Sequence, residues 1–273
     1  MSTSAKVTAR QRIENLLDDN SFVEIGAYVK ARNTDFNIQA KDTPSDGVIT
    51  GYGVINGGLV YVYSQDASVL GGSVGEMHAK KIASLYDMAM KTGSPVIGLI
   101  DSTGLRLQES VDGLNAFGQI YMKQSLASGV IPTVTAIFGN CGGGLSIVAG
   151  LSDFTFMEVE NAQLFVNSPN AITENRKEIC DNASAKFQSE EAGNVDFVGT
   201  EAEVIEGIRN LVSVLPSNNE DEASDLECYD DLNRAAEGIE NCGEDTLQAL
   251  TSISDEGYVL EVKKDYAPEM VTA

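Results

Sequence analysis

Short apolar runs alternate with amphipathic segments over residues 75–215 of the chain. Apolar runs of about four to eight residues are typical of buried strands, whereas apolar positions spaced three and four apart are typical of helices that cover a sheet. Strands that alternate with such helices form crossover units, so we expect an α/β fold with a parallel sheet buried on both faces. The pattern predicts helices at about 75–92, 110–127, 143–151 and 201–215, and strands at 95–100, 132–138, 154–157 and 163–166.

The first 63 residues follow a different pattern. A charged segment up to Asp18 carries apolar residues on one helical face, and residues 21–25 predict a short strand. Residues 33–46 are polar and predict a loop. Two β-rich runs on either side of Asn56-Gly57 then predict a hairpin over residues 47–63.

The composition changes after Pro216. Residues 217–231 are mostly acidic and polar, and such a segment cannot bury a core. The sequence therefore predicts a domain over residues 1–215, an acidic linker over 216–245 and a further element over 246–273.

The end of the chain is similar to its beginning. A shift of 237 positions aligns Leu16 with Ile253 and Ile25 with Val262, which predicts a second helix followed by a strand at 258–262. Chance similarity between two helix–strand units explains the match equally well. If the repeat is real, we expect this element to dock on a separate subunit or on a second copy of the chain, because a lone strand needs partners for its face and its edge.

Acidic residues dominate the charge. The sequence has 18 Lys and Arg against 41 Asp and Glu, a net charge of −23 at pH 7. Such a surface repels nucleic acid and anionic lipid, and an anionic ligand such as CoA needs a local cluster of cations. The four cysteines form no C-x-x-C pair, and neither a signal peptide nor a run of 18 apolar residues occurs. We expect a soluble, reduced, cytoplasmic protein without a metal site.

Candidate chemistry begins with a run of three glycines, Gly142 to Gly144, which follows a predicted strand and opens a predicted helix. Because these residues lack side chains, a ligand atom can touch their backbone N–H groups directly. Such donors suit an anion or a developing oxyanion. Tight packing alone explains many glycine runs, and that alternative stays open.

A second turn has the same character. Gly104 follows the strand at 95–100, and ligands of open parallel sheets gather where strands end and helices begin. Arg106 beside it is either a ligand-binding residue or a helix-capping or surface charge. The single histidine, His78, lies on a predicted helix with Lys80 and Lys81, and we expect it in a solvated position. No Ser/His/Asp set or phosphate-binding lysine motif occurs, so any chemistry relies on backbone groups and a cofactor.

Several stretches, in this order, resemble one family. The chain is similar to the carboxyltransferase subunits of propionyl-CoA carboxylase and of glutaconyl-CoA and methylmalonyl-CoA decarboxylases. The resemblance covers most of residues 9–215 and is carried by residues 9–24, Asp46-Gly-Val-Ile-Thr-Gly-Tyr-Gly53, residues 64–76, Asp101-Ser-Thr-Gly-Leu-Arg-Leu-Gln-Glu109, Ser128-Gly-Val-Ile-Pro132, Cys141-Gly-Gly-Gly144, residues 152–157 and 164–172.

The resemblance implies a crotonase-type (ClpP/crotonase) fold, with this chain as a single repeat followed by a C-terminal appendage. It implies a subunit that binds an acyl-CoA thioester and stabilises its enolate while a carboxyl group is exchanged with biotin carried on a partner protein. The implied partners are a second carboxyltransferase subunit with the other repeat, a biotin carrier protein, and a biotin carboxylase or a membrane decarboxylase subunit, in a hetero- or homo-oligomer. The implied oxyanion donors are Gly143, Gly144, Gly104 and Leu105, and the implied substrate-binding residues are Arg106, Gly142, Gly71, Gly72, Lys80 and Lys81.

The sequence departs from the family in three places. Thr103 replaces a glycine of the first turn, the match thins after Ile172 and around Val195-Asp196, and the chain ends where the second repeat begins. Alternatives are a subunit of the biotin-independent malonate decarboxylase type and a non-catalytic scaffold subunit. A hydratase is disfavoured because Ser146 stands where such crotonases often place a catalytic Glu.

Overall fold

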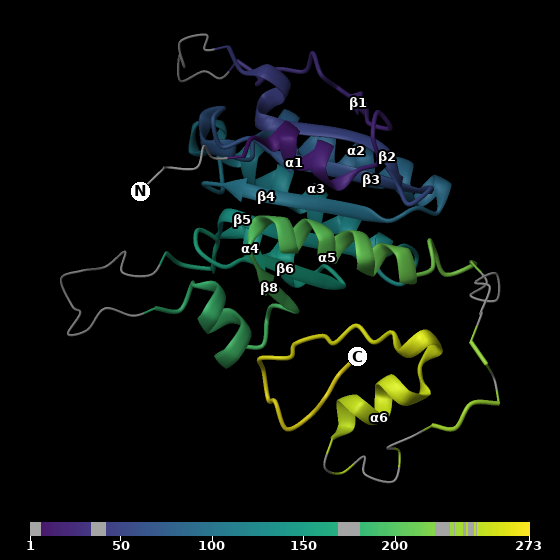
Figure 1. The fold of residues 1–273 in the computed structure, drawn as a ribbon. Coiled ribbons are helices and arrows are strands. Elements are labelled where there is room, and N and C mark those ends of the chain that lie inside the picture. The colour runs from purple at the N-terminus through teal and green to yellow at the C-terminus, as the bar shows by residue number, and fades with distance from the viewer. Residues whose placement is uncertain are drawn as a thin grey trace, which may run out of the picture.

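The computed structural model describes residues 7–33, 42–168, 181–221 and 245–273, together with residues 230, 231, 233–236, 239 and 243. Helices lie on both faces of one sheet (Figure 1). The helices are α1 (Ala9–Leu16), α2 (Glu76–Thr92), α3 (Ser110–Ala127), α4 (Gly144–Gly150), α5 (Glu201–Val214) and α6 (Thr246–Ile253). The strands are β1 (Val23–Ile25), β2 (Val48–Ile55), β3 (Gly58–Gln65), β4 (Val96–Ser102), β5 (Thr133–Gly142), β6 (Phe154–Glu158), β7 (Gln163–Phe165) and β8 (Phe197–Gly199). Single helical turns lie at Pro44–Gly47, Leu70–Gly72, Leu107–Glu109, Phe187–Glu191 and Asp255–Gly257.

The sheet is mixed, and its strand order is β1-β2-β3-β4-β5-β6-β8. β1, β2 and β3 pair antiparallel, whereas β3 through β8 pair parallel along that order. β7 adds a short parallel pairing beside the end of β5. The carboxyl ends of β3, β4 and β5 therefore meet at one edge of the sheet, where parallel sheets gather their ligands.

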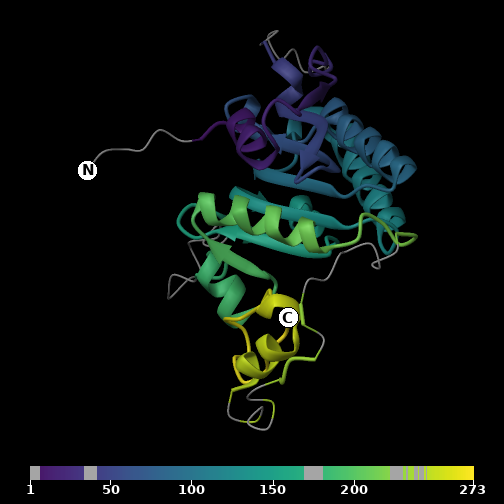
Figure 2. The same ribbon diagram turned by 45° about the vertical axis from the view of Figure 1, so that its right-hand side comes forward.

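Two helical layers enclose the sheet, as Figure 2 shows from the side. One core cluster includes residues of α2, α3 and α4, and the other includes residues of α1 and α5. Tyr63, Tyr86, Phe138 and Phe156 are among the largest side chains that are fully buried in these cores. The strands are apolar on both faces because each face is covered, which confirms the expected α/β architecture.

The predicted elements of residues 1–215 form close to their expected bounds. The Asn56-Gly57 turn closes the β2–β3 hairpin, with Ile55 paired to Gly58. Gly93 ends α2 in a left-handed conformation at φ 62°, which glycine adopts without steric cost. Parts of three expected features lie outside the described residues: the 33–46 loop, the resembling stretch to Ile172 with the thinner match beyond it, and the 216–245 linker.

The C-terminal element agrees only partly with its prediction. α6 begins and ends 237 positions after α1, and the capping residues Thr8 and Asp245 have the same spacing. The predicted strand at 258–262 is wrong: these residues form no strand, and only Val262 makes an isolated bridge, to Thr272. Among the described residues no strand lies beside the segment, and without one its backbone makes no more than this bridge.

The same element packs on its own domain, below β8 in Figure 1. The Lys263 N–H donates to the Asp196 carbonyl at 3.0 Å, and the Lys263 amine donates to the Gly193 carbonyl at 2.7 Å. Leu260 contacts the α1–α5 core cluster, and a Cβ on Gly193 would lie 2.9 Å from the Tyr266 ring. The C-terminal element, residues 246–273, is called the tail below. It is therefore attached to residues 193–196 of this chain.

Candidate active site

The two glycine turns of the sequence lie side by side. They follow neighbouring strands, since β4 and β5 pair in parallel up to Ser102 opposite Cys141. Gly104 has φ 94°, and a Cβ there would lie 3.3 Å from the Gly142 carbonyl oxygen. Two turns from different crossover units thus share one surface at the carboxyl edge of the sheet.

In the first turn, the backbone leaves one N–H group open. The Gly104 N–H donates to the Ser102 hydroxyl at 3.1 Å. Val74 donates to the Gly104 carbonyl at 2.8 Å and accepts from the Arg106 N–H at 2.9 Å. Since backbone groups alternate in direction along such a pairing, the N–H of the intervening Leu105 points away from Val74. It has no hydrogen-bond partner within the described residues.

In the second turn, the open N–H group belongs to Gly144, the second residue of the Gly143-Gly144 pair. Gly143 has φ 61° and ψ −125°, a conformation that only glycine adopts readily. Its N–H donates to the Phe165 carbonyl at 3.0 Å, so that donor is already used. The N–H of Gly144, the first residue of α4, has no partner among the described residues. Tyr121 fixes this residue from the other side, because its hydroxyl donates to the Gly144 carbonyl at 2.7 Å.

Four residues were expected to supply oxyanion donors, and the structure separates them into two kinds. The N–H groups of Gly104 and Gly143 bond within the protein, and those of Leu105 and Gly144 are open. Leu105 and Gly144 are also partly exposed, so a ligand can reach both turns. The two turns together offer a pair of backbone donors suited to a carbonyl oxygen that gains negative charge.

Gly71 and Gly72, which were expected to contact substrate, pack against the first turn and the end of β4. A Cβ on Gly72 would lie 2.4 Å from the Asp101 carbonyl oxygen. A Cβ on Gly71 would lie 2.9 Å from the Thr103 side chain, and the Thr103 N–H donates to the Gly71 carbonyl at 2.9 Å. The missing side chain at Gly71 leaves room for Thr103, which is how the turn accommodates that departure from the family.

Two of the three predicted cations are not available to a CoA phosphate in this structure. Arg106 is 2% exposed and bonds to Asp46 at 2.6 Å and to Glu109 at 2.9 Å. Lys81 is buried, and its amine donates to the carbonyls of Ser45 and Val48. Burial lowers the pKa of Lys81 to about 8. Both charges are satisfied inside the protein, which does not favour their expected role in binding CoA.

Lys80 keeps an exposed side chain. Its amine makes an ion pair with Glu76 at 2.6 Å, one helical turn earlier on α2. Such a pair at a half-exposed position is weak, so the amine can exchange Glu76 for another anion.

The expectation of a solvated His78 is wrong, because the residue is fully buried. Its Nδ1 lies 3.0 Å from the Asp46 carbonyl oxygen, and its Nε2 lies 3.1 Å from the Gln65 amide nitrogen. A carbonyl is only an acceptor, which places the proton on Nδ1. Burial lowers the pKa of His78 to about 3, so the imidazole is neutral and structural.

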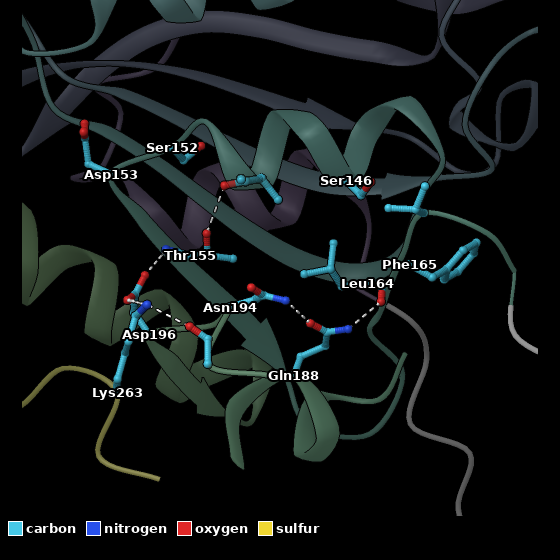
Figure 3. A pocket seen from close by; sticks show the side chains of 14 residues that line it. Ser146, Ser152, Asp153, Thr155, Leu164, Phe165, Gln188, Asn194, Asp196 and Lys263 are labelled. Carbon is cyan, nitrogen blue, oxygen red and sulfur yellow. Dashed lines mark hydrogen bonds and ion pairs between the residues drawn. The ribbon is translucent and has the colours of Figure 1, made fainter. Parts of the chain in front are cut away.

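A pocket of about 370 Å³ lies on the side of α4, lined by residues of α4, β7, the 188–196 segment and the tail (Figure 3). Lys263 projects toward Asp196 there, with 3.8 Å between amine and carboxylate. None of the predicted site residues lines it. Ser146 connects it to the second turn, since its hydroxyl donates to the Gly143 carbonyl at 2.7 Å.

Sequence reasoning missed the groups that hold the turns. Asp46 and Glu109 lie inside the stretches that resemble the family. Arg106 pairs with Glu109 three positions away and with Asp46 60 positions away, and the second pairing depends on the tertiary fold. Tyr121 reads as an ordinary residue of an amphipathic helix. Only the packing of α3 against α4 brings its hydroxyl to the second turn.

Comparison with known proteins decides the family. The model of the carboxyl transferase domain family matches residues 2–273. The chain belongs to the carboxyl transferase domain family. The α subunit of methylmalonyl-CoA decarboxylase of Propionigenium modestum is 39% identical over 280 residues, covering 98% of this chain and 54% of that protein. The propionyl-CoA carboxylase β chain of Roseobacter denitrificans is 37% identical over 278 residues, with 98% and 54% covered.

A solved structure of the family has the same fold. Transcarboxylase 12S, described as a hexamer assembly with methylmalonyl-CoA and methylmalonic acid bound, superposes with a TM-score of 0.90 at 35% identity, covering 97% of this chain and 53% of that chain. The expected crotonase-type fold is confirmed. The chain spans about half the length of the curated relatives it matches. In the described part of the chain, no helix is long and apolar enough to cross a membrane.

Proposed function

We propose that this chain is a carboxyltransferase subunit of a biotin-dependent acyl-CoA carboxylase or decarboxylase. The observation that carries the proposal is the pair of open N–H groups, Leu105 and Gly144, on adjoining turns at the carboxyl edge of the sheet. They hold the oxygen of an acyl-CoA thioester as it becomes an enolate. Each such donor is worth about 3–4 kcal/mol of transition-state stabilisation, or 10²–10³ in rate.

The surroundings of the turns suit a reaction whose base comes from outside the chain. The Cys141 thiol next to the second turn is buried, which raises its pKa to about 12. His78 is buried and neutral, and neither group is an effective base at neutral pH. Biotin, carried on a partner protein, supplies the carboxyl group and a basic nitrogen when it is bound. The chain itself orients the thioester and stabilises its developing charge.

We propose Lys80 as a contact for the CoA phosphates, because its amine is the one among the three predicted cations that reaches solvent in the described structure. With a net charge of −23, the surface as a whole repels CoA, so binding depends on such local cations and on contacts to the rest of the CoA molecule.

A partner subunit that carries the second crotonase repeat completes the assembly in this proposal. Support comes from α3, which begins beside the first turn and exposes four large apolar side chains, spaced three, eight and four residues apart. Their exposed fractions are 72% for Val111, 60% for Leu114, 53% for Met122 and 57% for Leu126. Several large apolar side chains exposed along one helix favour an interaction surface. The relatives' additional length, about half of each protein, is the source of such a repeat.

The tail supports the same assembly. The large apolar side chains that it exposes include Ile253, Tyr258 and Met270, with exposed fractions of 55%, 50% and 69%. We propose that they contact the partner subunit while the tail stays attached to its own domain.

Copurification of the native complex, followed by mass spectrometry of its subunits, tests the proposal and its direction. A biotin carrier protein with a biotin carboxylase indicates carboxylation, and one with a membrane decarboxylase subunit indicates decarboxylation. Calorimetry on the same complex is expected to show acyl-CoA binding. A complex without any biotinylated protein contradicts the proposal and favours the biotin-independent type. A complex without affinity for acyl-CoA at millimolar concentration contradicts it and favours a scaffold subunit.

A further inference from the structure

Arg106 is the next residue after Leu105, whose N–H group is open in the first turn. Every nitrogen of the Arg106 guanidinium has a hydrogen-bond partner. Nε donates to the Ser73 hydroxyl at 3.2 Å, and Nη2 donates to the Ser73 carbonyl at 2.7 Å. Nη1 donates to Asp46 at 2.6 Å and to Glu109 at 2.9 Å. The side chains of Arg106, Asp46 and Glu109 are at most 2% exposed, so this network is shielded from water.

The partners of Arg106 come from three separate segments that converge on the turn. Asp46 precedes β2, and its second carboxylate oxygen accepts the His78 N–H of α2 at 2.8 Å. Glu109 directly precedes α3, and its second oxygen accepts the Glu76 N–H at the start of α2 at 2.5 Å. The guanidinium therefore joins the loop before β2 and the first turns of α2 and α3 to one point.

The network is closely fitted and is costly to open. A Cβ on Gly75 would lie 2.3 Å from Glu109 and 2.5 Å from Arg106, so only glycine fits above this ion pair. Asp46 is held at φ 48°, a conformation that non-glycine residues rarely adopt. Burial raises the pKa of the Asp46 carboxyl, and Arg106 opposes that rise. Without Arg106, two buried carboxylates would face each other unpaired.

We propose that Arg106 is a positioning residue that fixes the Leu105 N–H in the oxyanion-binding geometry. The inference rests on the proposed function, since it concerns the acyl-CoA carbonyl. The backbone of residues 104–106 pairs with Val74, and the Arg106 side chain clamps Ser73, next to Val74, to the same turn. Both strands of this small pairing are thus locked by one side chain. Asp46 and Glu109 hold that side chain in place.

The inference predicts a specific pattern in the kinetics. Arg106 does not touch the ligand, so its loss leaves the contacts to the CoA portion unchanged. The Leu105 N–H moves by a fraction of its hydrogen-bond length, and a misplacement of about 1 Å costs roughly 10² in rate. We therefore expect kcat to fall by about 10² with KM nearly unchanged in Arg106→Met, and a partial recovery in Arg106→Lys.

The experiment measures the infrared stretch of the bound thioester carbonyl directly. The full chain, in complex with the subunits it copurifies with, is saturated with propionyl-CoA labelled with ¹³C at the thioester carbonyl, without a carboxyl donor. Difference infrared spectroscopy then reports the shift of the carbonyl stretch on binding. Wild type is expected to lower this frequency, Arg106→Met to lose most of the shift, and Arg106→Lys to recover part of it. The dissociation constant of propionyl-CoA is expected to change less than about threefold, because the CoA contacts are retained.

Arg209→Met is the matched control, because Arg209 also pairs with a carboxylate, Asp18 at 2.7 Å, but contacts neither turn. If Arg106→Met does not fold by circular dichroism, Asp46→Asn/Arg106→Met removes one of the two unpaired carboxylates, and Arg106→Lys is measured in parallel. A full frequency shift and unchanged kcat in any folded Arg106 variant overturns the inference. Loss of CoA affinity with a retained shift also overturns it, in favour of a substrate contact. A wild-type complex that binds acyl-CoA without any shift contradicts the proposed function instead.

Discussion

We propose that the two turns of the candidate site do the same task, and the structure holds them in different ways. The first, around Leu105, is held by buried charges: Arg106 between Asp46 and Glu109. The second, around Gly144, is held by backbone bonds and by the Tyr121 hydroxyl. Charge networks respond to protonation and to the loss of a partner, whereas a tightly packed glycine turn responds to added volume. The two donors are therefore expected to fail under different perturbations.

A larger side chain in place of Gly144 tests the second turn, and the decrease in kcat expected from it is the largest of the predicted effects. A Cβ on Gly144 would lie 2.7 Å from the Tyr121 hydroxyl and 3.1 Å from the Phe117 ring. Gly144→Val is expected to lower kcat of the assembled complex by about 10²–10³, while acyl-CoA affinity falls less. Gly150→Val on the same helix is the control, since nothing lies within 4 Å of a Cβ there. Turnover equal to wild type in a folded Gly144→Val protein removes the second turn from the site.

A charge on the apolar face of α3 tests the partner surface beside the first turn. Leu114→Glu is expected to abolish coelution with the partner subunit in size-exclusion chromatography, because a carboxylate would be buried without a counter-ion. Asn115→Glu adds the same charge at an exposed neighbouring position and is expected to leave assembly intact. If both variants assemble, α3 is not the docking surface.

Lowering the pH tests the buried network around Asp46 and His78 that supports the first turn. His78 donates to the Asp46 carbonyl, and its folded pKa of about 3 lies below the ordinary value of 6.5. As pH falls from 6.5 toward 3, the unfolded chain binds a proton that the folded chain does not, so stability falls by about 1 kcal/mol per pH unit. In His78→Gln this contribution disappears. Urea unfolding between pH 7 and 4 is expected to show the stability difference between variant and wild type shrinking with acid. Parallel curves contradict a neutral buried His78.

The smallest effect is expected for the Tyr121 hydroxyl. Tyr121→Phe removes one hydrogen bond to the Gly144 carbonyl but keeps the ring packing, and a bond of this kind is worth about 1 kcal/mol. We expect a kcat about fivefold lower with little change in the melting temperature. An unchanged kcat means that the backbone alone fixes this turn.

Local pattern was enough to predict most of the fold and both turns. The Asn56-Gly57 hairpin, the alternation after Gly75 and the glycine run at α4 follow from turn chemistry and periodicity. The roles of Arg106 and His78 did not follow, because an isolated charged residue gives no sign of its partner. Asp46 is 60 positions from Arg106, and burial of both depends on the tertiary fold. The strand predicted at 258–262 failed because a strand depends on a neighbouring strand, and the part of the chain that the structure describes places none there.

Transfer of carboxyl label is the most direct test of the central claim that the open N–H groups of Leu105 and Gly144 serve an acyl-CoA carboxyltransferase. The purified complex is incubated with biotin carrier protein and carboxyl-labelled methylmalonyl-CoA, malonyl-CoA or glutaconyl-CoA in turn. The account predicts label on biotin from at least one of these thioesters, at a rate about 10² or more above that of the Gly144→Val complex. Absence of transfer from all three with a folded, fully assembled wild type, or equal rates for wild type and Gly144→Val, would contradict it.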